Sequence, residues 1–347
     1  MQASEPIVEY SHLSCEDILV MGNNIPRRHH YVPRLLLRNF TDPSGALWVY
    51  DSRQKKCWKG RPESAAFERD LYTRKSSPAT PEFSDIENFL SESIDGPGAT
   101  AIAGLLKRER LAYKQWCAFL RFVAAQLQRT PAAFEHLAAF QAPLMQEMFQ
   151  RMGNFDPEFR ERVTKRLLAK GATQATIEKL FKSIKDGKMK VTPAKDYVVA
   201  LALASIDNIA DELSKMKWTF LGVEPGEPDL IIGDHPVMLA DPVSSAPLGL
   251  RNPNIELLMP LSRGMVACAR RDGPDSYGKL AHGMSELIND RTLRGSRRFV
   301  FAVARCEHIL ADAVRLHGTG PKMQTRRIQV GKGLMIVNQF HSPDLSP

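Results

Sequence analysis

The sequence predicts an α+β fold, with a mixed or antiparallel sheet from N- and C-terminal segments and a large helical layer inserted between them. Three observations predict this class. Strand-like runs occur early in the chain, helical periodicity fills about 85–216, and strand-like runs return from 218 to 340. We expect no membrane segment, because no apolar run approaches the ~18–20 residues that span a bilayer.

The first strands and the central helices have clear local signals. Residues 46–60 (ALWVYDSRQKKCWKG) are typical of a β-hairpin, since strand formers flank a polar turn. In 113–130, large apolar residues recur at intervals of three and four, which predicts an amphipathic helix with Trp116, Phe119, Leu120, Val123 and Leu127 on its inner face. The Gly96-Pro97-Gly98 sequence is expected to end or bend the helix before it.

The second half of the chain favours strands separated by Pro/Gly turns. We expect strands within 218–224, 229–239, 255–262, 264–271 and 297–304, a helix at 283–295, and one or two strands at 326–340. N- and C-terminal strands are predicted to share one sheet. The expected organisation is a loose segment at 1–26, a single α+β domain at 27–340 with its helical insertion at about 85–216, and a tail at 341–347.

Composition places the chain among ordinary globular proteins. Of its 347 residues, 43% are hydrophobic and 25% are charged, which excludes wholesale disorder. The five cysteines are scattered and form no CxxC pair, so we expect free thiols. The acidic N-terminus has no basic region followed by an apolar one. These features together predict the cytoplasm as the compartment.

Charge is distributed unevenly along the chain. Residues 101–195 carry 18 Lys/Arg against 8 Asp/Glu, residues 196–290 carry 7 against 14, and residues 291–332 carry 10 against 2. The segments 160–190 and 291–332 are therefore candidate contacts for nucleic acid. Two alternatives stay open: the charges are complemented inside the molecule, or the helices of 160–190 only keep the chain soluble.

The first candidate site is RRHHYVPR (27–34). Adjacent histidines on an extended segment point to opposite sides, so His29 and His30 are expected to have different surroundings. Either is a candidate metal ligand or general base. The alternative is a hydrogen-bonded structural histidine beside a packed Tyr31 and Pro33.

The second candidate site lies at the end of the central helix, in QLQRTP (126–131). Gln126 and Arg129 are three residues apart and point the same way on a mostly apolar face. Burial of these groups requires polar partners, and Arg129 suits a carboxylate or a phosphate. The alternative is a cation that caps the C-terminal end of the helix.

The third candidate site is the apolar strand that runs into Gly233-Asp234-His235-Pro236. A rigid strand end aims an acid well, so Asp234 is a candidate metal ligand or a group that orients a histidine. The alternative is a turn formed by the Asp side chain. Asn289 is a weaker candidate. Glu87 and Glu92 are interpreted as solvated helix residues.

Several enzyme classes lack their motifs in this sequence. There is no GxGxxG, Walker A, HExxH or GxSxG motif. This argues against dinucleotide-binding Rossmann enzymes, P-loop NTPases, zincins and α/β-hydrolases.

The order and spacing of several short motifs resemble a bacterial family known only as a domain of unknown function, number 4238. The motifs are HHYVPRLLLRNF (29–40), LWVYD (47–51), DLYT (70–73), FxxxQxxRTP (122–131), IIGDHP (231–236), MPLS (259–262) and LIN (287–289). The resemblance extends from about residue 28 to about 304 and implies no substrate.

The resemblance implies that the polar motif residues meet in space. These are His29, His30, Tyr31, Pro33, Gln126, Arg129, Asp234, Pro236 and Asn289. This sequence departs from the family pattern at Gly233, where a Ser or Thr is expected. His235 stands at a position that varies.

Two hypotheses for function follow. The first is a hydrolase, a metal-assisted phosphodiesterase or nuclease acting on nucleic acid or a nucleotide. In this hypothesis the catalytic residues are His29, His30, Gln126 and Asp234. A divalent metal binds His30 and Asp234. The substrate is bound by Tyr31, Arg38, Arg129 and Asn289. The second is a non-enzymatic protein that binds nucleic acid or protein, with the polar motif residues forming a structural network.

Overall fold

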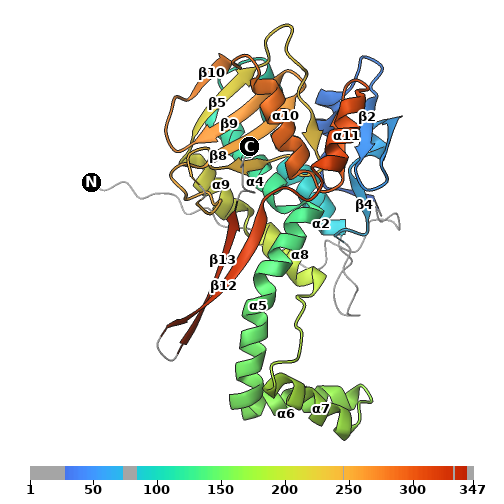
Figure 1. The fold of residues 1–347 in the computed structure, drawn as a ribbon, viewed down its shortest axis with the longest axis vertical. Helices are drawn as coiled ribbons and strands as arrows, with labels where there is room; N and C mark the ends of the chain where they lie inside the picture. The colour runs from blue at the N-terminus through green and yellow to red at the C-terminus, as the bar shows by residue number, and fades with distance from the viewer. Residues whose placement is uncertain (1–27, 73–83, 245, 331–332, 342–347) are drawn as a thin grey trace, which may run out of the picture.

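The described residues form an α+β architecture with four sheets and a long helical insertion (Figure 1). The computed structural model describes residues 28–72, 84–244, 246–330 and 333–341. The fold class predicted from the sequence is confirmed. The expected loose segment at 1–26 and nearly all of the expected tail lie outside the described residues.

One four-stranded sheet joins the two ends of the chain. Its order is β3 (Lys56–Gly60), β2 (Leu47–Asp51), β11 (Phe299–Ala302) and β6 (Ile232–Gly233), and each neighbouring pair is antiparallel. The predicted hairpin at 46–60 is the β2–β3 pair. Val49 of β2 lies opposite Phe301 of β11, so strands far apart in sequence are in register.

A separate five-stranded sheet contains most of the C-terminal strands. Its order is β10 (Ser276–Lys279), β5 (Lys217–Gly222), β9 (Met265–Arg270), β8 (Glu256–Ser262) and β7 (Met238–Ala240), with only β10 and β5 parallel. We expected a single shared sheet. The chain divides because Asp234–Pro236 interrupt the predicted strand 229–239, and Pro236 has no N–H for a ladder. Its halves, β6 and β7, enter different sheets.

The helical insertion lies between β4 (Phe67–Arg69), which pairs with β1 (Arg28–His30), and β5. It contains α2 (Ser84–Phe89), the π-helical turn η3 (Leu90–Asp95), α3 (Gly96–Leu106), α4 (Tyr113–Gln128), α5 (Pro131–Phe155), α6 (Pro157–Ala169), α7 (Gln174–Lys185), α8 (Lys195–Ala204) and α9 (Ile206–Ser214). The π-helical turn gives way to α3 at Gly96, as the expected boundary at Gly96–Gly98 indicates, but the chain stays helical across it. Gly96 is helical and Pro97 lies in the first turn of α3, where its missing N–H costs nothing.

The main core fixes the position of α4. The predicted inner face packs on the five-stranded sheet, where the Phe119 and Trp218 rings meet edge to face with centroids 5.1 Å apart. Phe122 and Val123 are fully buried on the same helix. The C-terminal end of α4 is therefore anchored in the interior, and the polar motif of 126–130 is placed there.

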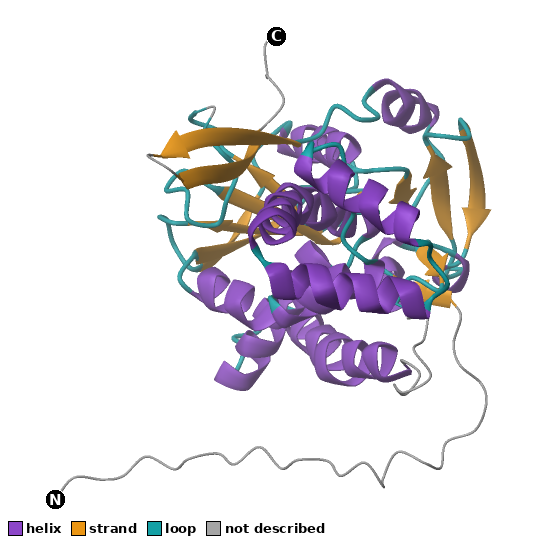
Figure 2. Ribbon diagram, turned by 90° about the horizontal axis from the view of Figure 1, so that it is seen from below, coloured by secondary structure: helices purple, strands orange, loops and turns teal. Residues whose placement is uncertain are grey.

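The helix α5 extends out of the body and carries α6 and α7 at its far end (Figure 1). These helices enclose a small apolar cluster of their own, formed by Phe159, Ile177, Phe181 and Ile184. The hairpin of β12 (Lys322–Val330) and β13 (Gly333–His341) lies beside α5. Figure 2 shows strands on opposite sides of the helices.

The remaining elements are short or lie late in the chain. They are α1 (Arg34–Leu37), the 3-10 turns η1 (Arg38–Phe40) and η2 (Pro62–Ser64), α10 (Met284–Gly295) and α11 (Glu307–Arg315). The sequence signals predicted α10 but not α11. In the part of the chain covered by the structure, no helix is both long and apolar enough to cross a membrane.

Candidate functional site

The guanidinium of Arg129, just after α4, is completely buried and joins three separate segments. Its Nη1 donates to Asp95 Oδ1 of η3 at 2.8 Å, and its Nε donates to the Tyr31 carbonyl at 3.2 Å. With the Gln126 amide oriented so that its oxygen faces the guanidinium, that oxygen lies 2.9 Å from Nη2 and 3.0 Å from Nε. Gln126 and Arg129 do share a buried face, and the carboxylate that Arg129 binds belongs to the chain itself.

His29 belongs to the same interior network. Its Nδ1 accepts a hydrogen bond from the Tyr72 N–H at 2.9 Å, and its ring stacks on the Tyr72 ring with centroids 5.2 Å apart. The Tyr72 hydroxyl donates to the Arg129 carbonyl at 3.2 Å, and burial raises the pKa of that hydroxyl. His29 is 2% exposed, so its observed contacts are structural ones.

His30 faces different surroundings, as expected for adjacent residues of a strand. Its Nε2 is buried and has no hydrogen-bond partner, and its ring lies against Phe67. Burial lowers the pKa of His30 to about 4, with the positive charge of Arg34 acting in the same direction. His30 is therefore a neutral imidazole with one unused nitrogen at neutral pH.

Glu87 of α2 is the second unsatisfied group in this region. Its Oε2 is buried without a partner, and burial raises its pKa from an ordinary 4.5 to about 7, although the Arg129 and Arg34 charges oppose that rise. Arg34 and Arg129 act electrostatically on both His30 and Glu87, so the four groups lie in one region. Sequence reasoning treated Glu87 as solvated. A usable signal was present, because Glu87 stands between the apolar Ile86 and Leu90, both of which are buried.

The buried Asp234 carboxylate accepts hydrogen bonds from backbone N–H groups. Its Oδ1 accepts from the Arg297 N–H at 2.7 Å, and its Oδ2 accepts from the Arg298 and Phe299 N–H groups at 2.8 and 2.9 Å. Burial raises its pKa, while these three bonds oppose the shift. Both oxygens are thus engaged in holding the entry to β11. The predicted catalytic and metal-binding roles of Asp234 remain untested predictions.

Ser296 explains why glycine occupies position 233. A Cβ at Gly233 would overlap the Ser296 Oγ, so a larger residue there requires the serine side chain to move. That hydroxyl is itself buried and donates to the Thr292 carbonyl at 2.6 Å.

The remaining predicted substrate-binding residues have local roles. Asn289 of α10 clamps the segment before β6: its Oδ1 accepts from the Ile231 N–H at 3.0 Å and its Nδ2 donates to the Asp229 carbonyl at 2.9 Å. Arg38 is exposed and pairs with Glu63 at 3.2 Å. Tyr31 is buried, and its pKa is raised by burial and by the Asp234 charge.

The sequence-predicted residues therefore divide into two groups. His29, His30, Tyr31, Gln126 and Arg129 gather around the end of α4, with Asp234 next to Tyr31, whereas Asn289 and Arg38 make separate contacts. Among the residues with described positions, no group of three or more His, Cys, Asp or Glu side chains is arranged to hold a metal ion.

Comparison with known protein families gives a match over residues 28–305 to the family described as "Protein of unknown function (DUF4238)". The chain belongs to the DUF4238 family. No curated protein and no solved structure matches it. The match contains every predicted site residue and ends before the β12–β13 hairpin, so in this DUF4238 protein the hairpin lies outside the matched segment.

The two basic segments differ in how their charges are satisfied. In 291–332, six arginines form ion pairs. Arg291, Arg297 and Arg298 pair with acids distant in the sequence. Arg294, Arg305 and Arg315 pair with acids two to four residues away. In the tip formed by α6 and α7 (157–190, hereafter the basic tip), only Arg162 and Lys188 form ion pairs, and Arg160 packs on the Phe181 ring. In the described structure, internal ion pairs therefore engage all six arginines of 291–315 but only two cations of the basic tip, and Lys322 of the first segment has no ion pair.

The basic tip carries seven exposed cations that form no ion pair in the described structure: Lys165, Arg166, Lys170, Lys179, Lys182, Lys185 and Lys190. Other exposed cations without an ion pair lie on the body, among them Lys107, Arg110 and Lys114. The two segments do not form a continuous face, because α6 and α7 lie at the opposite end of α5 from α10 and α11 (Figure 1). The basic tip is the candidate polyanion-binding surface.

Replacing Glu87 with Gln is expected to change the pH dependence of stability. A folded-state pKa of about 7 means that the folded chain retains a proton that the unfolded chain releases near 4.5. The wild type therefore loses stability as pH rises through about 7. We expect Glu87→Gln to gain about 1–3 kcal/mol in unfolding free energy over the wild type between about pH 5 and pH 8 in urea titrations. Glu92→Gln, an exposed change, is the control. Equal pH profiles for Glu87→Gln and the wild type would contradict a buried Glu87.

Proposed function

We propose that this DUF4238 protein binds nucleic acid through its basic tip. The observation that carries the proposal is the group of seven exposed Lys/Arg side chains without ion pairs on the basic tip. A nucleic acid releases condensed counterions when its phosphates contact cationic side chains. Cations that are not already paired with acids therefore bind it more strongly than paired ones. The apolar cluster of Phe159, Ile177, Phe181 and Ile184 gives the array a fixed support.

An exposed aromatic ring favours single strands over duplexes. Phe155 ends α5 directly before the basic tip, and it is 82% exposed. Unpaired bases stack on such rings regardless of sequence, whereas bases in a duplex are already stacked. The combination of Phe155 with the neighbouring cations therefore supports a single-stranded ligand without base specificity.

The interior network supports the non-enzymatic hypothesis for the motif residues. His29, Gln126 and Arg129 are satisfied by groups of the chain itself, and the same is true of Asp234 and Asn289. Side chains with their hydrogen-bonding capacity committed in this way define the fold. In this proposal they support the body from which α5 projects, and contact with the ligand takes place at the tip.

Charge reversal on α7 tests the proposal. We expect Lys179→Glu/Lys182→Glu/Lys185→Glu to weaken binding of a labelled single-stranded oligothymidylate at least about tenfold, and to flatten the dependence of log K on log salt. Fluorescence anisotropy at several salt concentrations measures both effects. Phe155→Ala is expected to weaken binding without changing the salt slope.

The matched control is Lys107→Glu/Arg110→Glu/Lys114→Glu, which changes net charge equally at exposed positions of the body. If both triple variants bind as the wild type does, the tip has only a solubility role. If the tip variant loses binding to anionic lipid vesicles but not to the oligonucleotide, the partner is a membrane surface and the proposal fails.

A second candidate function is phosphodiester hydrolysis, now centred on His30 and Glu87. The observation that favours it is that both side chains carry a buried polar atom without a partner, beside the exposed Arg34. In this scheme Arg34 binds the phosphate and the unused His30 Nε2 orients the attacking water by a hydrogen bond. Glu87 accepts the proton of that water as its oxygen forms a bond to phosphorus. A P–O bond then breaks, and the leaving oxygen takes a proton from solvent. A divalent metal bound by the substrate phosphate is compatible with the scheme.

Cleavage of the same labelled oligonucleotide, with and without Mg²⁺, tests this second candidate. We expect Glu87→Gln and His30→Gln each to lower the cleavage rate at least about a hundredfold while binding at the tip is unchanged. Asp234→Asn is the structural control. It removes the carboxylate that holds the entry to β11, so it is expected to lower the melting temperature without removing a catalytic group. Cleavage that persists in both His30 and Glu87 variants rules out this centre.

The cytoplasm is the compartment that we propose for this protein. Cys57, Cys117, Cys268 and Cys306 are free thiols, as a reducing compartment maintains them.

A further inference from the structure

A cavity of about 700 Å³ lies at the body end of α5, away from the basic tip. It is bounded by the first turns of α5, by β7 and the loop after it, by the end of α10, and by the base of the β12–β13 hairpin. Cavities of this size enclose most of a small organic molecule. None of the residues assigned a catalytic, metal-binding or substrate-binding role from the sequence lines it, although their neighbours Leu127, Gln128 and His235 do.

Much of the cavity lining is apolar. It includes Leu127 of α4, Leu137 and Phe140 of α5, and Leu248 and Phe340 from later in the chain. Phe340 packs edge to face on His136 with centroids 4.9 Å apart, and its carbonyl accepts from the Leu248 N–H at 2.6 Å. These residues offer hydrophobic and aromatic surface to the body of a ligand.

Positively charged side chains also line the cavity. Five cationic side chains line the cavity, against the single carboxylate of Glu135: Arg53, Arg291, Arg294, Arg297 and Lys322. Arg291 is paired with Glu256, Arg294 with Asp290, and Arg297 with Glu135. Within the described structure, Arg53 and Lys322 have no ion pair. The cavity therefore holds an uncompensated positive charge that an anion would neutralise.

His235 provides a neutral hydrogen-bonding group in the same cavity. Its Nδ1 lies 2.8 Å from the Thr130 Oγ1, and that hydroxyl also caps α5 by accepting from the Ala133 N–H. Burial lowers the pKa of His235 to about 4, and the nearby His136 acts in the same direction. A neutral ring that uses Nδ1 for Thr130 leaves Nε2 for a ligand.

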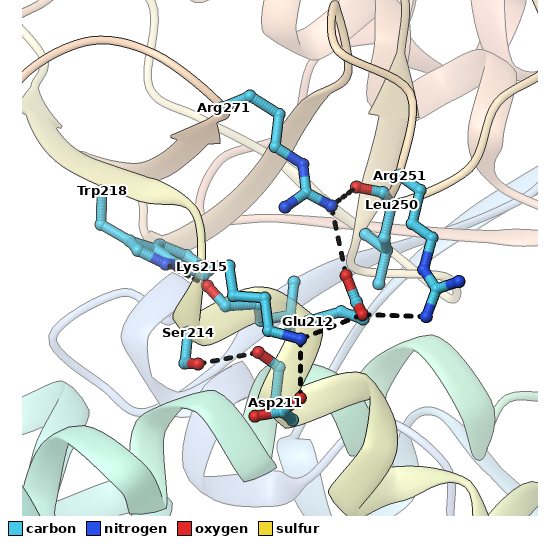
Figure 3. Close-up of polar contacts among 9 residues, drawn as sticks. Asp211, Glu212, Ser214, Lys215, Trp218, Leu250, Arg251 and Arg271 are labelled. Atoms are coloured by element: carbon cyan, nitrogen blue, oxygen red, sulfur yellow. Dashed lines mark hydrogen bonds and ion pairs between the residues drawn. The ribbon is translucent and has the colours of Figure 1, made fainter.

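The loop that bears Leu248 and Leu250 is held in place without a ligand. Figure 3 shows Arg271 donating to the Leu250 carbonyl and to Glu212, and Arg251 pairing with the same Glu212 carboxylate. Lys215 completes the set of cations on Glu212, at 3.2 Å. A wall fixed in this way does not have to be ordered on binding, which favours affinity for a small ligand.

We propose that this cavity binds an organic phosphate whose body is apolar or aromatic. Arg53 and Lys322 would contact the phosphate, and Phe340, Leu248 and Leu137 would contact the body. The unpaired guanidinium suits a phosphate, since its fork of N–H groups matches two oxygens. The site is separate from nucleic-acid binding at the basic tip, because α5 places the two at opposite ends of one helix (Figure 1).

Calorimetric titration with three probes tests the proposal: naphthyl phosphate, naphthol and inorganic phosphate. We expect naphthyl phosphate to bind at least about tenfold more tightly than either of the others, because it alone uses both the cationic and the apolar lining of the cavity. Arg53→Gln/Lys322→Gln is expected to weaken the binding of naphthyl phosphate about tenfold and to leave the affinity for naphthol unchanged. Gly249→Phe is expected to weaken the binding of both naphthyl phosphate and naphthol. Gly249 lines the cavity and a Cβ added there meets no atom within 4 Å, so the phenyl ring has room to occupy part of the cavity.

Two control variants complete the design. Lys56→Gln removes an exposed cation outside the cavity and should bind all probes as the wild type does. The charge-reversed α7 triple variant should also bind naphthyl phosphate normally, which separates this proposal from the one for nucleic acid. The proposal is overturned if naphthyl phosphate binds no more tightly than naphthol. It is equally overturned if Arg53→Gln/Lys322→Gln and Gly249→Phe, shown by circular dichroism to be folded, both bind it as the wild type does.

Discussion

The buried ion pair between Arg129 and Asp95 is the interaction on which the rest of the structure depends. A guanidinium without solvent exposure must be paired, and removing one partner of such a pair costs roughly 3–5 kcal/mol. Arg129 also binds the Tyr31 carbonyl, so one side chain joins the end of α4, the π-helical turn and the N-terminal segment. Thr130, the next residue, caps α5 and binds His235. The direction of α5 and the wall of the cavity therefore follow from the same short sequence.

The long helix α5 separates two different chemical environments. At its start, a cavity combines apolar walls with two unpaired cations, and at its end a small helical unit presents an array of unpaired lysines and an arginine. The first environment suits a compact anion with an apolar body, and the second suits an extended polyanion. The β12–β13 hairpin, which lies outside the segment matched to DUF4238, contributes Lys322 and Phe340 to the cavity.

Periodicity in the sequence was sufficient to predict the α+β class, the inner face of α4, the β2–β3 hairpin and the shared orientation of Gln126 and Arg129. Roles that depend on distant backbone groups could not be predicted. Asp234 binds N–H groups more than sixty residues away, and the segment 291–332 finds its acids in Asp51, Glu135 and Glu256 as well as nearby. Composition reports the number of charges in a segment, whereas their pairing depends on the tertiary fold. Glu87 is a different case, because its position between the buried Ile86 and Leu90 was a local signal that it is not solvated.

The most direct test of the account is the substitution Arg129→Lys, with unfolding free energy and affinity for single-stranded oligothymidylate measured on the same preparation. Lysine keeps the charge but loses the fork that binds Asp95, Tyr31 and Gln126 together. The account predicts a loss of about 2–4 kcal/mol in unfolding free energy and an unchanged affinity under conditions where the variant is folded. A variant as stable as the wild type that no longer binds the oligonucleotide would contradict it, and would place Arg129 at the ligand.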